Sequence, residues 1–427
     1  MRKWIAAAAR VAQLRRMRAV IAAASALVAL PALSACDGTI GAGLDAGPPA
    51  PGPFAVTEAP PEVQSRTPRL STSAGGMLLS WQTTYETAGT DTADQVLRFA
   101  VWRDGEWSPP RTVVRRDDLF VNWADFPSII AAGDDSLIAH WLQYNGPGTY
   151  AYQVRLAFSG DGGETWSSPI VPHERETETE HGFVSLLAGD DALEVVWLDG
   201  RAYAAGPEEM SLRSVSVSRD GVPGAEEVLD SRVCDCCQTS MVAASGGLVV
   251  AYRGRTGDEI RDIVAVRRVD GAWRRPVRVH DDGWRIDACP VNGPSLAAAG
   301  DVVIATWFTA AHDSARVLAA VSGDGGASFG PPVRIDDGRP LGRVAVLDVA
   351  DGRFVVAWME ALEAGGAEIR LRAVDAEGRR SSSVAAGGTS TSRASGFPVL
   401  GSFGGEVFVA WTDPDAHRVR LARGPAN

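Results

Sequence analysis

The sequence predicts an all-β fold, a β-propeller of four-stranded antiparallel blades, and two observations support this prediction. Seven apolar segments, each ending on one aromatic residue, recur every 51 to 60 residues. A repeat of this length that holds several short strands is typical of propellers. A second set of small apolar segments runs 13 or 14 residues ahead of the aromatic ones. We count seven blades, with six as the alternative if two of the weaker units merge.

Each unit can be divided into strands in chain order. The small segments, such as "FPSIIAA" and "TSMVAAS", suit the innermost strand because space near the axis is tight. The aromatic segment follows as the second strand, and segments such as "QVRLAFS" and "SPPRTVV" supply the third and fourth. The aromatic residues are Trp81, Trp141, Trp197, Tyr252, Trp307, Trp358 and Trp411.

The two ends of the repeat region predict how the ring closes. The last unit stops after "HRVRLARGPAN", one strand short of a full blade. The leading segment "PFAVTEAP" has no blade of its own. We therefore expect this leading segment to supply the missing outer strand of the last blade.

Residues 1–36 have the pattern of a secretory signal, with an Arg-rich start and an apolar run from Val20 to Leu33. The segment "LSAC" resembles the lipobox of bacterial lipoproteins, which implies a lipid on Cys36 and a membrane anchor. The alternatives are a signal peptide cleaved near Ala35 or a short uncleaved anchor. Residues 37–53 are rich in Gly and Pro and predict a flexible tether, which leaves 54–427 for the propeller. The expected location is the bacterial cell envelope, periplasmic or on the outer surface.

The charge of the chain excludes one class of partner. The formal net charge is −12, whereas nucleic-acid binding needs a basic face. No run after the signal approaches the ~18 apolar residues that a membrane span needs. The possible partners are the membrane, through the lipid, and a glycan, metal or protein ligand at the mouth of the propeller channel.

Two turns carry a family resemblance. The segments "FSGDGGETWSSP" and "VSGDGGASFGPP" match the Asp-box pattern S-x-D-x-G-x-x-W, with Phe for Trp in the second. In this they resemble the bacterial sialidases and the wider BNR-repeat propellers. An Asp in such a turn can accept hydrogen bonds from turn amides, and Gly supplies positive φ, so we expect a structural role. The residues concerned are Ser159, Asp161, Gly163 and Trp166, and Ser322, Asp324, Gly326 and Phe329.

The resemblance also implies a chemistry, which the chain matches only in part. Sialidases use three arginines around a carboxylate, an acidic acid/base and a Tyr nucleophile. Arg66, in "SRTPRL", resembles the N-terminal arginine of the family, and Arg343 and Arg393 fall at later blade entrances. The family's tyrosine lies late in the chain, whereas all six tyrosines here lie at or before Tyr252. We assign no catalytic residue, and an exo-α-sialidase remains the alternative function.

The four cysteines after Cys36 are expected to meet. "CDCCQTS" places Cys234, Cys236 and Cys237 in the lead-in to an innermost strand, and "DACPVNGPS" places Cys289 in the lead-in one blade later. Lead-ins of neighbouring blades converge on one mouth of the channel.

Two main hypotheses for this cluster stay open, with redox chemistry of an exposed thiol as a third. Four cysteines in an exported protein suit two disulfides, although C-x-C spacing is too tight for a relaxed bond. Converging thiolates equally suit one Cu(I) or Zn(II) ion, with His181, from the preceding blade, as a further ligand. The sequence therefore predicts an exported, non-enzymatic lipoprotein that binds a ligand at a mouth lined by cysteine and arginine.

Overall fold

The computed structural model describes residues 47–426, apart from 61–62, 87–92, 134, 175–176, 207–208 and 351. The predicted signal peptide and the lipid site at Cys36 lie outside the described residues. Pro51 and Gly52, assigned to the flexible tether, are buried, since this segment lies against the backbone of Arg380 and Gly424. The described part of this segment, residues 47–53, therefore packs against the propeller.

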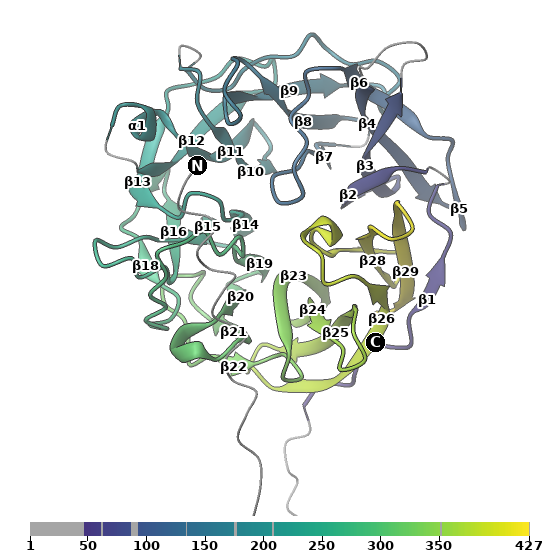
Figure 1. Cartoon of the computed structure of the whole chain (residues 1–427), viewed down its shortest axis with the longest axis vertical. Helices are drawn as coiled ribbons and strands as arrows, with labels where there is room; N and C mark the ends of the chain where they lie inside the picture. Colours follow the sequence, from purple (N-terminus) through teal and green to yellow (C-terminus); the bar gives the residue numbers. More distant parts are fainter. Residues whose placement is uncertain are drawn as a thin grey trace, which may run out of the picture. The chain divides into compact units, whose positions relative to one another are not determined.

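The described strands form seven antiparallel sheets arranged in a ring, which confirms the propeller and the count of seven blades (Figure 1). Blade 1 contains β2 (Ser65–Ser73), β3 (Gly76–Glu86), β4 (Ala93–Arg103), β5 (Glu106–Trp107) and β6 (Arg111–Arg116). Blade 2 contains β7 (Ser128–Ala131), β8 (Leu137–Tyr144) and β9 (Tyr152–Ser159), with a bridge from Leu156 to Ile170 in place of a fourth strand. Blade 3 contains β10 (His181–Ala188), β11 (Ala192–Asp199), β12 (Met210–Ser218) and β13 (Glu227–Val233).

The remaining blades repeat this order. Blade 4 contains β14 (Ser240–Ala244), β15 (Gly247–Arg253), β16 (Ile263–Val269), β17 (Ala272–Trp273) and β18 (Val277–Arg278). Blade 5 contains β19 (Ser295–Ala299), β20 (Val302–Thr309), β21 (Arg316–Ser322) and β22 (Val333–Arg334). Blade 6 contains β23 (Pro340–Ala350), β24 (Arg353–Ala361), β25 (Ala367–Asp375) and β26 (Arg380–Thr389). Blade 7 contains β27 (Val399–Phe403), β28 (Glu406–Asp413), β29 (Arg418–Pro425) and β1 (Ala55–Thr57).

Blade 7 closes the ring as the sequence predicted. Strand β1, from the "PFAVTEAP" segment, pairs with β29, with Ala55 opposite Arg423. The outer strand of the last blade thus comes from the start of the folded chain, which covers an edge that would otherwise be open.

The seven predicted aromatic residues all lie in second strands and are 0 to 3% exposed. They pack between neighbouring blades. Trp197, for example, belongs to a cluster that includes Leu142 and Val154 of blade 2. A buried indole needs a hydrogen-bond acceptor, and Trp197, Trp307 and Trp358 donate to the carboxylates of Asp199, Asp282 and Glu360.

Both Asp-box turns show the contacts that a structural role requires. In the first, the Ser159 hydroxyl donates to Asp161 at 2.7 Å and accepts from the Gly163 amide at 2.8 Å, and Gly163 has a φ of 87°. Trp166 packs edge-on against Phe99 of the neighbouring blade. In the second, Ser322, Asp324 and Gly326 repeat these contacts, and Phe329 packs against a core cluster between blades.

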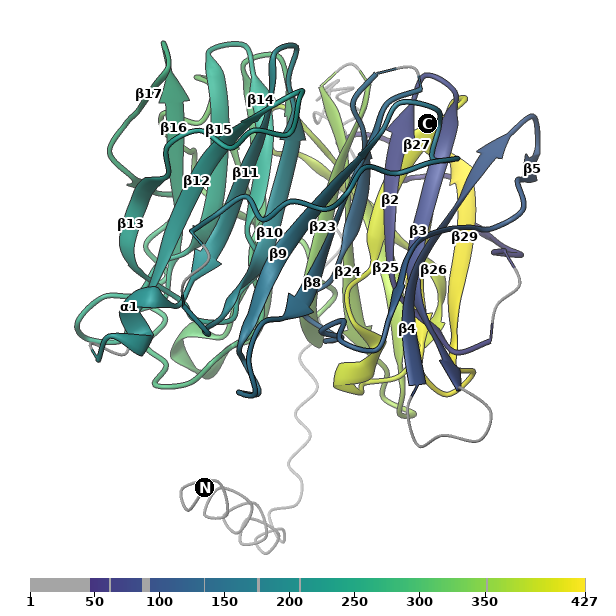
Figure 2. The same ribbon diagram turned by 90° about the horizontal axis from the view of Figure 1, so that it is seen from above.

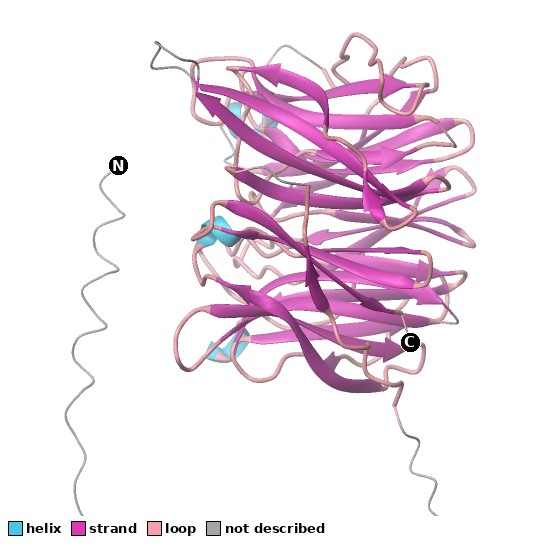
Figure 3. Cartoon of the chain, turned by 90° about the vertical axis from the view of Figure 1, so that its right-hand side faces the viewer, coloured by secondary structure: helices cyan, strands magenta, loops and turns pink. Residues whose placement is uncertain are grey.

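Among the described residues, helical structure is limited to short turns on one face of the ring (Figure 3), namely α1 (Arg201–Ala204), η1 (Ala311–Asp313) and η2 (Arg393–Ser395). Viewed from the side, the strands of neighbouring blades run alongside one another, with loops at both ends (Figure 2). Within the described residues, no helix is long and apolar enough to span a membrane.

Candidate functional site

The lead-ins to the innermost strands meet around the propeller axis, as the repeat pattern predicts. They enclose a cavity of about 90 Å³, to which all seven blades contribute. This is the share of liquid volume that about three water molecules occupy. Small-molecule sites usually measure hundreds of Å³, so this cavity is small for such a site.

The cysteine loop, residues 234–239, joins β13 to β14 and is tied to three other blades. The Cys234 amide donates to the carbonyl of Arg253 at 2.9 Å. The Gln238 side chain donates to the carbonyl of Ala124 at 2.7 Å and accepts from the Gly293 amide at 3.0 Å. Thr239 donates to the carbonyl of Phe183 at 2.8 Å. These contacts hold the loop across the mouth of the channel.

The structure brings the four cysteines together. The Sγ atoms of Cys234, Cys236 and Cys237 all lie within 4.8 Å of one another. Cys236 forms a disulfide with Cys289, with the two Cα atoms 6.1 Å apart. Cys234 and Cys237 are free thiols, each 1% exposed, whereas Cys289 is exposed. The disulfide hypothesis therefore holds for one pair, and the remaining pair leaves a cluster that could hold a metal ion.

Positive charge lies beside this free pair. The guanidinium of Arg261, 2% exposed, donates to the Cys234 Sγ at 3.6 Å. Burial opposes ionisation of Cys234, but the Cys237 thiol, the Cys236 amide and Arg261 outweigh it and lower the pKa of Cys234 to about 7. Burial raises the pKa of Cys237. The pair is therefore suited to share one proton, with Cys234 as thiolate and Cys237 as the donating thiol.

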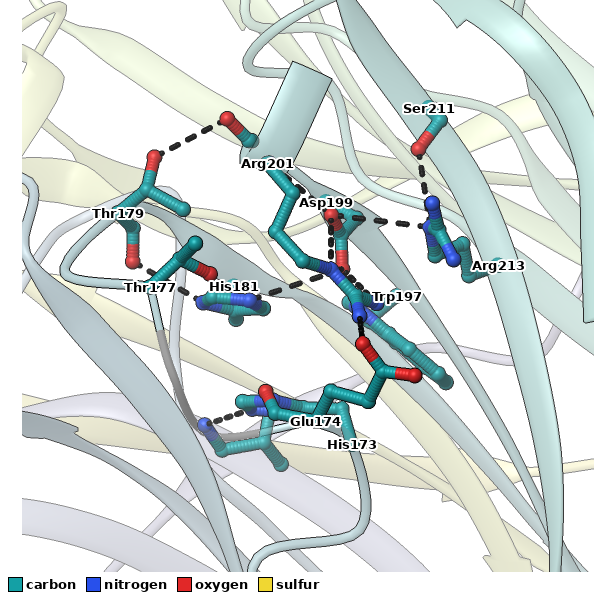
Figure 4. A network of polar contacts seen from close by, with 12 residues as sticks. His173, Glu174, Thr177, Thr179, His181, Trp197, Asp199, Arg201, Ser211 and Arg213 are labelled. Carbon is teal, nitrogen blue, oxygen red and sulfur yellow. Dashed lines mark hydrogen bonds and ion pairs between the residues drawn. The ribbon is translucent and has the colours of Figure 1, made fainter. Parts of the chain in front are cut away.

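His181 does not join the sulfur atoms. It begins β10, where its Nδ1 faces the Thr179 carbonyl at 3.0 Å and its Nε2 lies 3.6 Å from an Asp199 oxygen (Figure 4). Arg201 donates to Asp199 at 2.7 Å. Burial lowers the pKa of His181, so the ring is neutral. Both ring nitrogens thus point at partners other than the cysteines.

The three predicted arginines lie in different surroundings. Arg343, 7% exposed, donates to the carbonyls of Ser392 at 3.0 Å and Gly396 at 3.1 Å. Burial and the nearby charge of Arg393 lower the pKa of Arg343 to about 10. Arg393 is exposed on the rim, and Arg66 donates to the Thr84 hydroxyl. Two backbone carbonyls therefore hold the Nη1 atom of Arg343.

Sequence reasoning missed a pair of acids that share a tyrosine. The Tyr152 hydroxyl lies 2.7 Å from an Asp125 oxygen and 2.9 Å from a Glu180 oxygen. A hydroxyl donates only one proton, so one acid must itself be protonated. Asp125 also accepts from the Phe183 amide at 2.8 Å, which favours its ionised form. We infer that Glu180 is the protonated partner.

Both acids lie in the segments that lead into innermost strands, "WADFPS" and "EHGFVS", which correspond in the repeat to the cysteine loop. This correspondence could have predicted that the two acids lie near the mouth of the channel. Burial and then the charge of Asp125 raise the pKa of Glu180 to about 8. Burial raises the pKa of Asp125 to about 7.

The wild-type protein is expected to lose stability relative to Glu180→Gln as pH rises from about 4.5 to about 8. In this window the unfolded chain ionises Glu180 while the folded chain keeps it protonated, so rising pH favours unfolding. A glutamine amide donates to Tyr152 as the protonated acid does, and it does not titrate. Urea denaturation of both proteins across this window measures the difference, and a difference independent of pH would contradict the assignment.

The Asp-box turns and the seven closed blades define a sialidase-like β-propeller. No family model and no curated protein matches the chain. Among solved structures, a Hadza microbial sialidase is 15% identical with a TM-score of 0.41, covering 69% of this chain and 63% of its own. A neuraminidase-like protein from A/bat/Guatemala/164/2009 is 10% identical with a TM-score of 0.48, covering 90% and 97%. An α-L-arabinofuranosidase from Fusarium graminearum is 13% identical with a TM-score of 0.45, covering 88% and 97%.

This chain spans less than two thirds of the Hadza sialidase. At these identities the likenesses concern the fold alone, and the chemistry has to be argued from the site of this chain.

Proposed function

We propose that the protein is an exported β-propeller that binds one soft metal ion at the cysteine loop, with Cys234 and Cys237 as the ligands. The observation that carries the proposal is the pair of buried free thiols, whose sulfur atoms lie within 4.8 Å of each other and next to Arg261. Thiolates are preferred by Cu(I) and Zn(II) among the common metals.

The disulfide decides between these two metals. Structural Zn(II) sites take four ligands, and this loop offers four only after Cys236–Cys289 is reduced. Cu(I) accepts two thiolates, so the oxidised protein suits Cu(I). Arg261 would offset part of the negative charge that two thiolates bring into a buried site.

A non-enzymatic role is part of the proposal. Two observations support it: the cavity on the axis is small, about 90 Å³, and the Nη1 atom of Arg343 already donates to the carbonyls of Ser392 and Gly396. We further propose that a lipid on Cys36 holds the propeller at the membrane of the cell envelope, on the strength of the "LSAC" segment.

Metal binding is tested by titrating the oxidised protein with Cu(I) against a competing chelator, with Cys36→Ser in every variant. We expect about one Cu(I) per chain, and loss of most of the binding in Cys234→Ser and in Cys237→Ser, because each removes half of the coordination shell. The double variant Cys236→Ser with Cys289→Ser is the matched control, since it leaves only the two proposed ligands in the site and should still bind. Undiminished binding by Cys234→Ser would overturn the proposal.

A further inference from the structure

The four cysteines combine an exposed disulfide with a buried dithiol. Cys289, at the surface, is bonded to Cys236, and the Sγ of Cys236 lies within 4.8 Å of the Sγ atoms of both Cys234 and Cys237. Cys234 and Cys237 have the C-x-x-C spacing found in thiol–disulfide oxidoreductases. The metal site uses only the dithiol and gives the neighbouring disulfide no part in binding the ion.

We propose that the cysteine loop is a thiol–disulfide relay, which exchanges the disulfide between the Cys236–Cys289 pair and the Cys234–Cys237 pair. This inference goes beyond metal binding and does not depend on it. The ligand class that the relay serves is an external thiol or disulfide, which would react at Cys289.

The exchange takes two steps and needs no added oxidant. The Cys234 thiolate attacks the Sγ of Cys236, which forms a Cys234–Cys236 bond, breaks the Cys236–Cys289 bond and releases Cys289 as a thiolate that takes up a proton. The Cys237 thiol then loses its proton and attacks the Sγ of Cys234, which forms Cys234–Cys237 and releases Cys236. In total, two electrons move from the buried pair to the Cys236–Cys289 pair, together with the one proton that Cys237 carried, and the second proton comes from solvent.

Geometry favours this order of events. Arg261, at 3.6 Å from its Sγ, favours the thiolate of Cys234, so Cys234 is the attacking group. The C-x-C bond between Cys234 and Cys236 is tight and would be resolved quickly, whereas C-x-x-C is an ordinary disulfide spacing. The product carries a thiol at exposed Cys289, and the covalent link between the lead-ins of blades 4 and 5 is gone.

The relay is tested on the mature chain with Cys36→Ser, kept metal-free with a chelator and holding its single disulfide. A bulky maleimide is added under native conditions, and the disulfides are then mapped by mass spectrometry. We expect labelled Cys289 together with a Cys234–Cys237 disulfide, because labelling removes Cys289 from the equilibrium. Cys234 and Cys237 themselves are too buried to react first.

Variants separate the two steps. Cys234→Ser removes the attacking group, and labelling of Cys289 should slow at least ~10-fold. Cys234→Ala gives the same comparison if the serine variant folds poorly. Cys237→Ser should still expose Cys289 but accumulate the Cys234–Cys236 bond.

Labelling of Cys289 at the same rate without Cys234, or an unchanged Cys236–Cys289 bond in the wild-type chain, would overturn the relay. Either result leaves the Cu(I) titration unaffected. A chain that fails to bind Cu(I) could equally still show the exchange.

Discussion

Replacing Cys236 and Cys289 together by serine is expected to lower the free energy of unfolding by about 4 kcal/mol. The bond joins residues 53 positions apart in the sequence. In the unfolded chain it closes this long segment into a loop, which lowers the conformational entropy of the unfolded state. Chain-entropy arguments give the largest stabilisation to such long loops. The bond also links the lead-ins of blades 4 and 5, where the cysteine loop already contacts Gly293.

The effect should appear as a lower midpoint in urea denaturation under non-reducing conditions. Two controls distinguish the cross-link from packing. A thiol reductant should lower the stability of the wild-type protein to that of the double variant and leave the variant unchanged. Cys237→Ala, which removes a buried thiol outside the bond, should cost much less. A loss that persists in reductant would mean that the serines disturb packing rather than open a cross-link.

The architecture could be predicted because each blade repeats one burial pattern. Trp197 and Trp358 mark the second strand wherever it occurs, since that strand packs against neighbouring blades. The closure by β1 followed from counting strands, and it needed no knowledge of side-chain geometry.

Convergence of the cysteines followed from the same repeat, because lead-ins meet at one mouth. Their pairing did not follow, since spacing alone does not determine which sulfur faces Cys289. His181 occupies the expected lead-in, but its ring turns toward Asp199, at the end of the adjacent strand β11. A side chain's direction depends on such neighbours, which the repeat pattern does not specify.

Contacts with backbone atoms and the sharing of protons also could not be predicted from the sequence. The acceptors of Arg343 are carbonyls of Ser392 and Gly396, which any residue type would supply. The sharing of Tyr152 between Asp125 and Glu180 depends on three separate segments meeting within 3 Å. The sequence shows that the lead-ins contain acids, but it does not show that they share Tyr152 of β9 as a partner.

Replacing Asp199 by asparagine is expected to lower the free energy of unfolding by about 3–5 kcal/mol, the usual result of breaking one side of a buried ion pair. The Asp199 side chain is fully buried and accepts from Arg201 at 2.7 Å and from Trp197 at 2.8 Å. Arg213 lies 3.7 Å away. Asparagine keeps the shape but removes the fully buried carboxylate of the group, and the partly buried Arg201 and Arg213 are left with Glu226 as their shared carboxylate (Figure 4).

The matched control is Glu174→Gln, because Glu174 pairs with the same arginine at 2.9 Å but is 78% exposed. An exposed pair contributes at most ~1 kcal/mol, so this variant should remain close to the wild type in urea denaturation. Burial opposes ionisation of Asp199, but the hydrogen bonds from Arg201 and Trp197 outweigh it and lower its pKa to about 2, from an ordinary 3.8.

The contribution of Asp199 is therefore fully present above pH 3.8 and is lost as pH falls through 2. The difference in free energy of unfolding between the wild type and Asp199→Asn should become smaller over this interval, because acid neutralises the carboxylate that the variant lacks. Two results would contradict this prediction: an equal loss of stability in Asp199→Asn and Glu174→Gln, or a stability difference between wild type and Asp199→Asn that stays constant in acid. Either would show that the charge of Asp199 does not stabilise this part of blade 3.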